Sequence, residues 1–127
     1  LMIRALGALQ DAGVEPDIGK VEGLARREDC ERIVDAARRA GRREVGLIVL
    51  GRGADEKKVV GWIEVAATVA GFIGFAVGRT TFWDAIADWE AGRIARNAAA
   101  AQVARRYRHW VDVFEHARTA GAQAARP

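Results

Sequence analysis

Residues 45–53, VGLIVLGRG, decide the fold class of this chain. The first six are an apolar run without polar alternation, which is typical of a parallel strand that is covered on both faces. Asp55 follows the glycines and suits the N-cap of a helix whose apolar residues recur at helical spacing: Val59, Val60, Trp62, Ile63 and Ala66. A buried strand that leads through a glycine turn into an amphipathic helix predicts an α/β fold.

Two further units of the same kind flank this one. Residues 71–77, GFIGFAV, predict a second buried strand, which leads into a polar loop at 78–81 and a short helix over 82–91. Upstream, the short apolar segment 18–21 between chain breakers predicts a strand, and residues 26–40 predict an amphipathic helix that stops at Gly41. Strand and helix alternate three times at a spacing of about 30 residues, as in βαβ units.

Helices are also expected at both ends of the chain. Residues 2–12 follow a helical period that ends at Gly13, and residues 97–120 predict a long helix. The buried stripe expected on that long helix consists of Val103, Tyr107, Trp110, Val111 and Phe114. We therefore predict a domain over residues 1–120 and a frayed C-terminal tail over 121–127.

About three parallel strands make an incomplete sheet. They leave two bare edges and one uncovered apolar face, whereas a closed (β/α)8 TIM barrel needs eight strands and about 250 residues. The pattern favours the C-terminal half of such a barrel, and the helix-like start at Leu1 suggests a fragment or a processed N-terminus. An open α/β sandwich, or a homo-oligomer in which two halves complete each other, remains an alternative.

The composition indicates which classes of partner and which cellular location to expect. Half of the residues are hydrophobic, which predicts a folded core, and the net charge of +3 comes without a basic block interleaved with aromatics. We therefore expect no nucleic-acid partner. The single cysteine, Cys30, and the lack of a signal peptide or membrane-length apolar run predict a cytoplasmic protein without a membrane partner.

Two Gly-Arg loops are the strongest candidate binding feature. Gly51-Arg52-Gly53 and Gly78-Arg79-Thr80 each follow a strand and precede a helix, where free N–H groups and an arginine hold phosphate well. Glycine at a strand-to-helix turn is usually present only because the backbone conformation requires it. The third glycine of a dinucleotide fingerprint is missing, because position 56 is Glu.

The first strand carries the candidate catalytic pair. Alternation places Lys20 and Glu22 on one face of that strand. A buried lysine with a lowered pKa attacks carbonyl groups to form a Schiff base, and a neighbouring acid relays protons. An ion pair at a strand end is the plainer interpretation.

Other chemistry-bearing residues have plain interpretations too. His109, Asp112 and His116 share a face of the long helix, but a solvated or capping role is expected there rather than a metal site. Four tryptophans at helical positions predict core packing, with Trp83 noteworthy beside the second Gly-Arg loop. The basic cluster of Arg105, Arg106 and Arg108 predicts a solvated helix face.

Three motifs together resemble a known family. Residues 17–22 (DIGKVE), 50–53 (LGRG) and 74–83 (GFAVGRTTFW) are similar to the C-terminal part of the aldolase-like domain fused to 5-dehydro-2-deoxygluconokinase in bacterial inositol catabolism. A more distant resemblance is to class I tagatose-bisphosphate aldolases. The resemblance as a whole covers roughly residues 11–115, and residues 74–83 are its most specific motif.

The resemblance implies a class I lyase that cleaves 2-deoxy-5-keto-gluconate 6-phosphate to dihydroxyacetone phosphate and malonate semialdehyde. It assigns Lys20 as the Schiff-base lysine, Glu22 as the adjacent acid, and Gly51, Gly53, Gly78 and Arg79 to the substrate phosphate. No cofactor or metal is expected. The expected partners are the N-terminal barrel half, which supplies the other catalytic groups, and a carbohydrate kinase domain.

Two rival functions stay open at this point. One is a non-catalytic module that binds a sugar phosphate or assembles with an attached kinase. The other is a nucleotide-binding open α/β domain.

Overall fold

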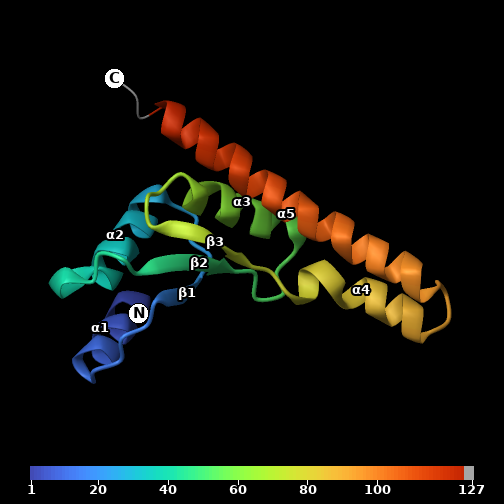
Figure 1. The fold of residues 1–127 in the computed structure, drawn as a ribbon, viewed down its shortest axis with the longest axis horizontal. Helices are drawn as coiled ribbons and strands as arrows, with labels where there is room; N and C mark the ends of the chain where they lie inside the picture. The colour runs from blue at the N-terminus through green and yellow to red at the C-terminus, as the bar shows by residue number, and fades with distance from the viewer. Residues whose placement is uncertain (125–127) are drawn as a thin grey trace.

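The structure is a computed structural model that describes residues 1–124 (Figure 1). Its elements follow one another in the order α1 (Met2–Asp11), β1 (Ile18–Glu22), α2 (Arg27–Ala37), the 3-10 helix η1 (Arg39–Gly41), β2 (Gly46–Leu50), α3 (Glu56–Ala67), β3 (Phe72–Ala76), α4 (Arg79–Glu90) and α5 (Arg96–Ala124). The predicted α/β class is therefore confirmed.

The three strands form one parallel sheet in the order β1-β2-β3. Lys20 pairs with Ile48, Glu22 with Leu50, and Leu50 in turn with Ala76. Because all strands run the same way, their C-terminal ends and the loops that follow meet at one edge of the sheet. Every candidate site residue except Lys20 lies at or just beyond this edge.

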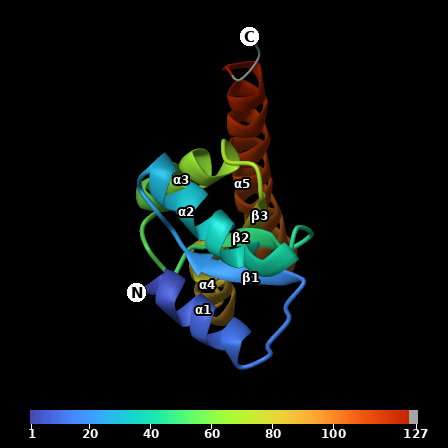
Figure 2. The ribbon, with the colours of Figure 1, turned by 90° about the vertical axis from the view of Figure 1, so that its left-hand side faces the viewer.

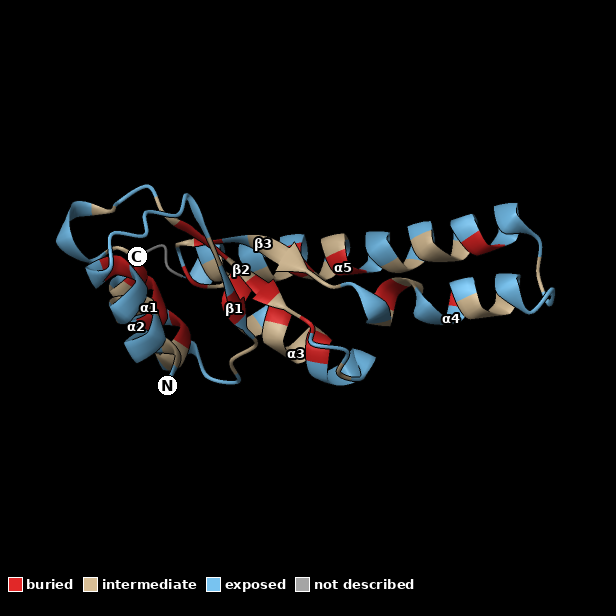
Figure 3. Cartoon of the chain, turned by 90° about the horizontal axis from the view of Figure 1, so that it is seen from below, coloured by how far each residue is buried: buried red, intermediate tan, exposed pale blue. Residues whose placement is uncertain are grey.

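Helices cover one face of the sheet. Val21, Leu47 and Val49 point into a core that α2 and α3 complete, with Cys30 and Ile33 at 1% exposure. A second cluster joins α3 to α5 through residues that are almost wholly buried: Val59, Ile63, Trp110 and Phe114. Figure 3 shows the buried residues concentrated where these helices meet the strands.

The opposite face of the sheet is open. It carries Ile18 and Ile73, which are 51% and 50% exposed although both are large and apolar. The two belong to the same face, because a Cβ at Gly46, the partner of Ile18, would lie 2.6 Å from Ile73 Cδ1. A parallel sheet is normally covered on both faces, so this surface is unusual for a monomeric α/β domain.

α1 lies beside α2 at the β1 side of the sheet (Figure 2). The buried Gln10 Nε2 donates a hydrogen bond of 2.9 Å to the carbonyl oxygen of Ala37. Arg39 donates to the carbonyl oxygen of Gly7 at 2.8 Å and forms an ion pair with Asp11. These polar contacts hold α1 against α2, together with Met2 and Leu6, which pack against the core.

α4 and α5 form a helical hairpin that extends past the sheet before α5 returns over α3 (Figure 1). α4 begins three residues earlier than predicted. Tyr107 is 56% exposed, so the expected buried stripe of α5 is wrong at that position. α5 continues past Ala120 to Ala124, while residues 125–127 of the predicted tail lie outside the described residues.

None of the helices within residues 1–124 is both long and apolar enough to cross a membrane.

Candidate functional site at the C-terminal edge of the sheet

The ends of β1 and β2 are joined by an ion pair. The guanidinium of Arg52, in the loop after β2, donates to the Glu22 carboxylate at the end of β1. Arg52 has a φ of 51°, a left-handed conformation that is uncommon for a residue with a side chain. The fold thus brings together two predicted site residues, and it commits Arg52 to Glu22 rather than leaving it free.

The two Gly-Arg loops lie against each other. Gly53 has a φ of +69°, and a Cβ there would lie 3.2 Å from Arg79 Nη2. Glycine is needed for both reasons, because it tolerates this conformation and lets the guanidinium approach the backbone. Thr80 Oγ1 donates a hydrogen bond of 3.0 Å to the carbonyl oxygen of Ala54. The two loops, each predicted separately from its place after a strand, are therefore in contact in the structure.

The second Gly-Arg segment is the first turn of α4 rather than the predicted loop. Gly78 is the N-cap, and its carbonyl oxygen accepts from the N–H groups of Thr81 and Phe82 at 2.8 and 3.3 Å. Arg79 and Thr80 therefore sit at the helix N-terminus, where N–H groups lack intrahelical acceptors and the helix dipole is positive. The helix starts three residues before the predicted position because the Thr81 hydroxyl donates a hydrogen bond of 2.8 Å to the Val77 carbonyl oxygen.

Beside these loops lies an open pocket of about 760 Å³. Its walls come from the start of α3, the first half of α4 and the middle of α5, and they include Glu56, Arg79, Trp83, Asp84 and Arg106. The expected core packing is wrong for Trp89, which is 43% exposed, while Trp83, set apart from the other tryptophans in the sequence, is 60% exposed. Arg106, expected on a solvated face, instead lines this pocket and pairs with Asp84 at 3.3 Å. No sequence signal placed it here, because the contact depends on how α5 folds back over α4.

Lys20 does not lie in this pocket. Its side chain is exposed on the open face rather than buried, which corrects the expectation of an interior lysine. It lines a separate, largely apolar pocket between α1 and β1 that also contains Leu6, Leu9 and Ile18. The physical reason is that, within residues 1–124, α1 only borders Lys20 and no other strand or helix lies over it.

One histidine of α5 contacts α3, and the other contacts its own helix. His109 Nε2 lies 3.5 Å from Glu56 Oε1, and His116 Nδ1 lies 2.6 Å from the carbonyl oxygen of Asp112. Across residues 1–124, no three His, Cys, Asp or Glu side chains are grouped so that they would hold a metal ion.

Comparisons with known proteins place the chain in a family without adding an activity. Neither a curated protein nor a solved structure matched it. A family model described as "Uncharacterized protein conserved in bacteria (DUF2090)" matches residues 1–118, which is nearly the whole sequence. The chain belongs to the DUF2090 family.

Proposed function

We propose that this chain is the phosphate-binding half of a (β/α)8 barrel that acts as a class I aldolase on a phosphorylated keto sugar acid. The observation that carries the proposal is the meeting of the two Gly-Arg loops at the C-terminal edge of a parallel sheet. Barrel enzymes place their active sites at that edge, and their phosphate sites often use the loops after the last two strands. Gly51, Gly53, Gly78, Arg79 and Thr80 would form the phosphate clamp.

The open face supports the barrel part of the proposal. β1 and β3 each have a free edge, and Ile18 and Ile73 are half exposed on the uncovered face. In a closed barrel this face lines the interior and the two edges pair with neighbouring strands. Further strands of the barrel, supplied by an N-terminal half, would bury both isoleucines and enclose Lys20.

Lys20 would act as the Schiff-base amine in the complete barrel. It shares the open face with Glu22, two residues further along β1, so an acid stands beside the amine. Enclosure would remove water from the ammonium group and favour the neutral amine that attacks a carbonyl carbon. Cleavage of 2-deoxy-5-keto-gluconate 6-phosphate to dihydroxyacetone phosphate and malonate semialdehyde is the specific reaction that we propose.

Borohydride trapping tests this role directly. The full-length protein is reduced in the presence of dihydroxyacetone phosphate, and the adduct is located by peptide mass mapping. The chain has only three lysines, so Lys57→Ala and Lys58→Ala serve as matched controls. We expect an adduct on Lys20 that Lys20→Ala abolishes and both controls keep. An absent adduct, or one undiminished in Lys20→Ala, contradicts the aldolase proposal.

A non-catalytic sugar-phosphate-binding or assembly module, attached to a carbohydrate kinase, is the second candidate. The separation of Lys20 from the pocket that holds Arg79 favours it. This candidate predicts that sugar phosphates raise the melting temperature of wild type and Lys20→Ala equally and do not stabilise Arg79→Ala. Loss of the stabilisation in Lys20→Ala would exclude it.

A further inference from the structure

We infer that the pocket between α3, α4 and α5 recognises the carbon skeleton of a phosphorylated sugar, with Trp83 as its stacking surface. The inference rests on the phosphate-binding part of the proposed function and agrees with its second candidate, the non-catalytic module, because Lys20 does not line this pocket. Trp83, Asp84, Glu56 and Arg106 have no part in the clamp described above, yet they line the same pocket as Arg79.

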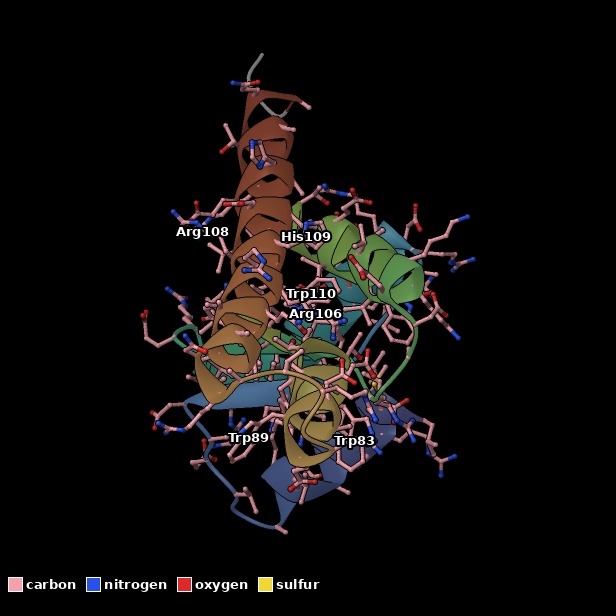
Figure 4. All side chains as sticks on the ribbon, turned by 90° about the vertical axis from the view of Figure 1, so that its right-hand side faces the viewer. Trp83, Trp89, Arg106, Arg108, His109 and Trp110 are labelled. Atoms are coloured by element: carbon pink, nitrogen blue, oxygen red, sulfur yellow. The ribbon has the colours of Figure 1, made fainter. Side chains whose placement is uncertain are left out.

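The position of Trp83 is the first argument. It follows Arg79 by one helical turn on α4, and 60% of the residue is exposed in a pocket that opens to solvent. A ligand whose phosphate sits at Arg79 and Gly53 has Trp83 as the neighbouring apolar surface. Figure 4 shows Trp83 on the side of α4 where α3 lies and Trp89 on the other side. An indole face is a suitable platform for the C–H groups of a sugar ring.

The charges of the pocket are the second argument. Asp84 is paired with Arg106, Glu56 faces His109, and the Asp55 carboxylate accepts the Lys58 N–H at the start of α3. Among residues 1–124, Arg79 forms no ion pair, which leaves one cationic group for one phosphate.

The carboxylates then select the rest of the ligand. Ionised Asp and Glu only accept hydrogen bonds, so they suit the hydroxyl groups of a sugar. A second or third phosphate group would meet these carboxylates without a further unpaired arginine of the pocket beside it, so a nucleoside diphosphate or triphosphate fits this pocket poorly. One unpaired arginine, one exposed indole and the carboxylates together indicate a sugar monophosphate.

Isothermal titration calorimetry of the full-length protein with three probes tests the inference. The probes are inorganic phosphate, glucose 6-phosphate and AMP, and the variants are Trp83→Ala, Trp83→Phe, Trp89→Ala and Arg79→Ala. Trp89 is the matched control, because it is exposed on the same helix and does not line this pocket. We expect Trp83→Ala to weaken glucose 6-phosphate binding about tenfold, the equivalent of one stacking contact, and to leave phosphate binding unchanged.

The remaining variants separate the possible failures. Trp83→Phe keeps an aromatic face and is expected to bind glucose 6-phosphate nearly as well as wild type. The inference is overturned if Trp83→Ala leaves glucose 6-phosphate binding intact, if it weakens both phosphates equally, or if Trp89→Ala has the same effect. Tighter, Trp83-dependent binding of AMP overturns the sugar assignment. A different result would contradict the proposed function itself: Arg79→Ala would bind inorganic phosphate as well as wild type does.

Discussion

Trp110 Nε1 donates a hydrogen bond of 2.9 Å to Thr81 Oγ1, and both residues are buried. The Thr81 hydroxyl in turn donates a hydrogen bond to the Val77 carbonyl oxygen. The end of β3, the first turn of α4 and the middle of α5 are therefore linked by one satisfied polar chain. This link fixes the turn that carries Arg79 and Thr80.

Removal of the hydroxyl at Thr81 should be costly. Thr81→Val keeps the shape but leaves the Trp110 indole N–H buried without an acceptor, so we expect the free energy of unfolding to fall by about 1–3 kcal/mol. Thr81→Ser keeps the acceptor and should lose much less. Urea unfolding of the three proteins checks this. Equal stability of the Val and Ser variants would show that the hydrogen bond contributes nothing.

Gly23 and Gly61 should respond to alanine in opposite directions. A Cβ at Gly23 would lie 2.0 Å from Trp62 Cδ2, so the indole must move, and we expect a loss of about 1–3 kcal/mol from overpacking. At Gly61, inside α3, a Cβ meets nothing within 4 Å. Gly61→Ala should raise the free energy of unfolding by about 0.5–1 kcal/mol. Thermal unfolding measures both, and Trp62→Leu should partly rescue Gly23→Ala.

Cys30 should make the protein less stable at high pH. Burial, with smaller contributions from Asp29 and Glu31, raises the pKa of the Cys30 thiol from 9.0 to about 11. A raised folded-state pKa means that the folded protein holds this proton more tightly than the unfolded chain. The stabilisation is therefore complete below pH 9.0 and is lost as the pH rises toward 11.

The size of this effect is about 2–3 kcal/mol. Chemical unfolding between pH 8 and 11 should show a steeper loss of stability in wild type than in Cys30→Val, which lacks the thiol. Parallel curves for the two proteins would contradict the assignment.

Arg79 and Arg52 should differ in their importance for phosphate. Arg79 lines the pocket without an ion-pair partner in residues 1–124, whereas Arg52 is engaged by Glu22. We expect Arg79→Ala to weaken inorganic phosphate binding about tenfold or more, because a charge-assisted hydrogen bond is lost. Arg52→Ala should have a smaller effect. Titration followed by ³¹P NMR compares them, and a larger effect of Arg52→Ala would place the phosphate on the β1 side of the loops.

The strands were predictable because their signals are local. Apolar runs bounded by glycine and polar residues predicted strands over 18–21, 45–50 and 71–77, and β1, β2 and β3 confirm them as parallel neighbours. The start of α4 was less predictable. Its first turn depends on a hydrogen bond that Thr81 donates to Val77 and on one that Thr81 accepts from Trp110, which lies far along the chain.

The sequence by itself determined the α/β class and a parallel sheet, because strand and helix alternate as in βαβ units, and the strand ends of such a sheet meet at one edge. Only the tertiary structure decided which side chains surround that edge. Helical positions suggested core packing for Trp89, but the α4–α5 hairpin runs past the sheet, and both Trp83 and Trp89 are exposed. The alternation of side chains along β1 predicted the face of the strand on which Lys20 lies. Whether Lys20 is exposed depends on whether other strands cover that face.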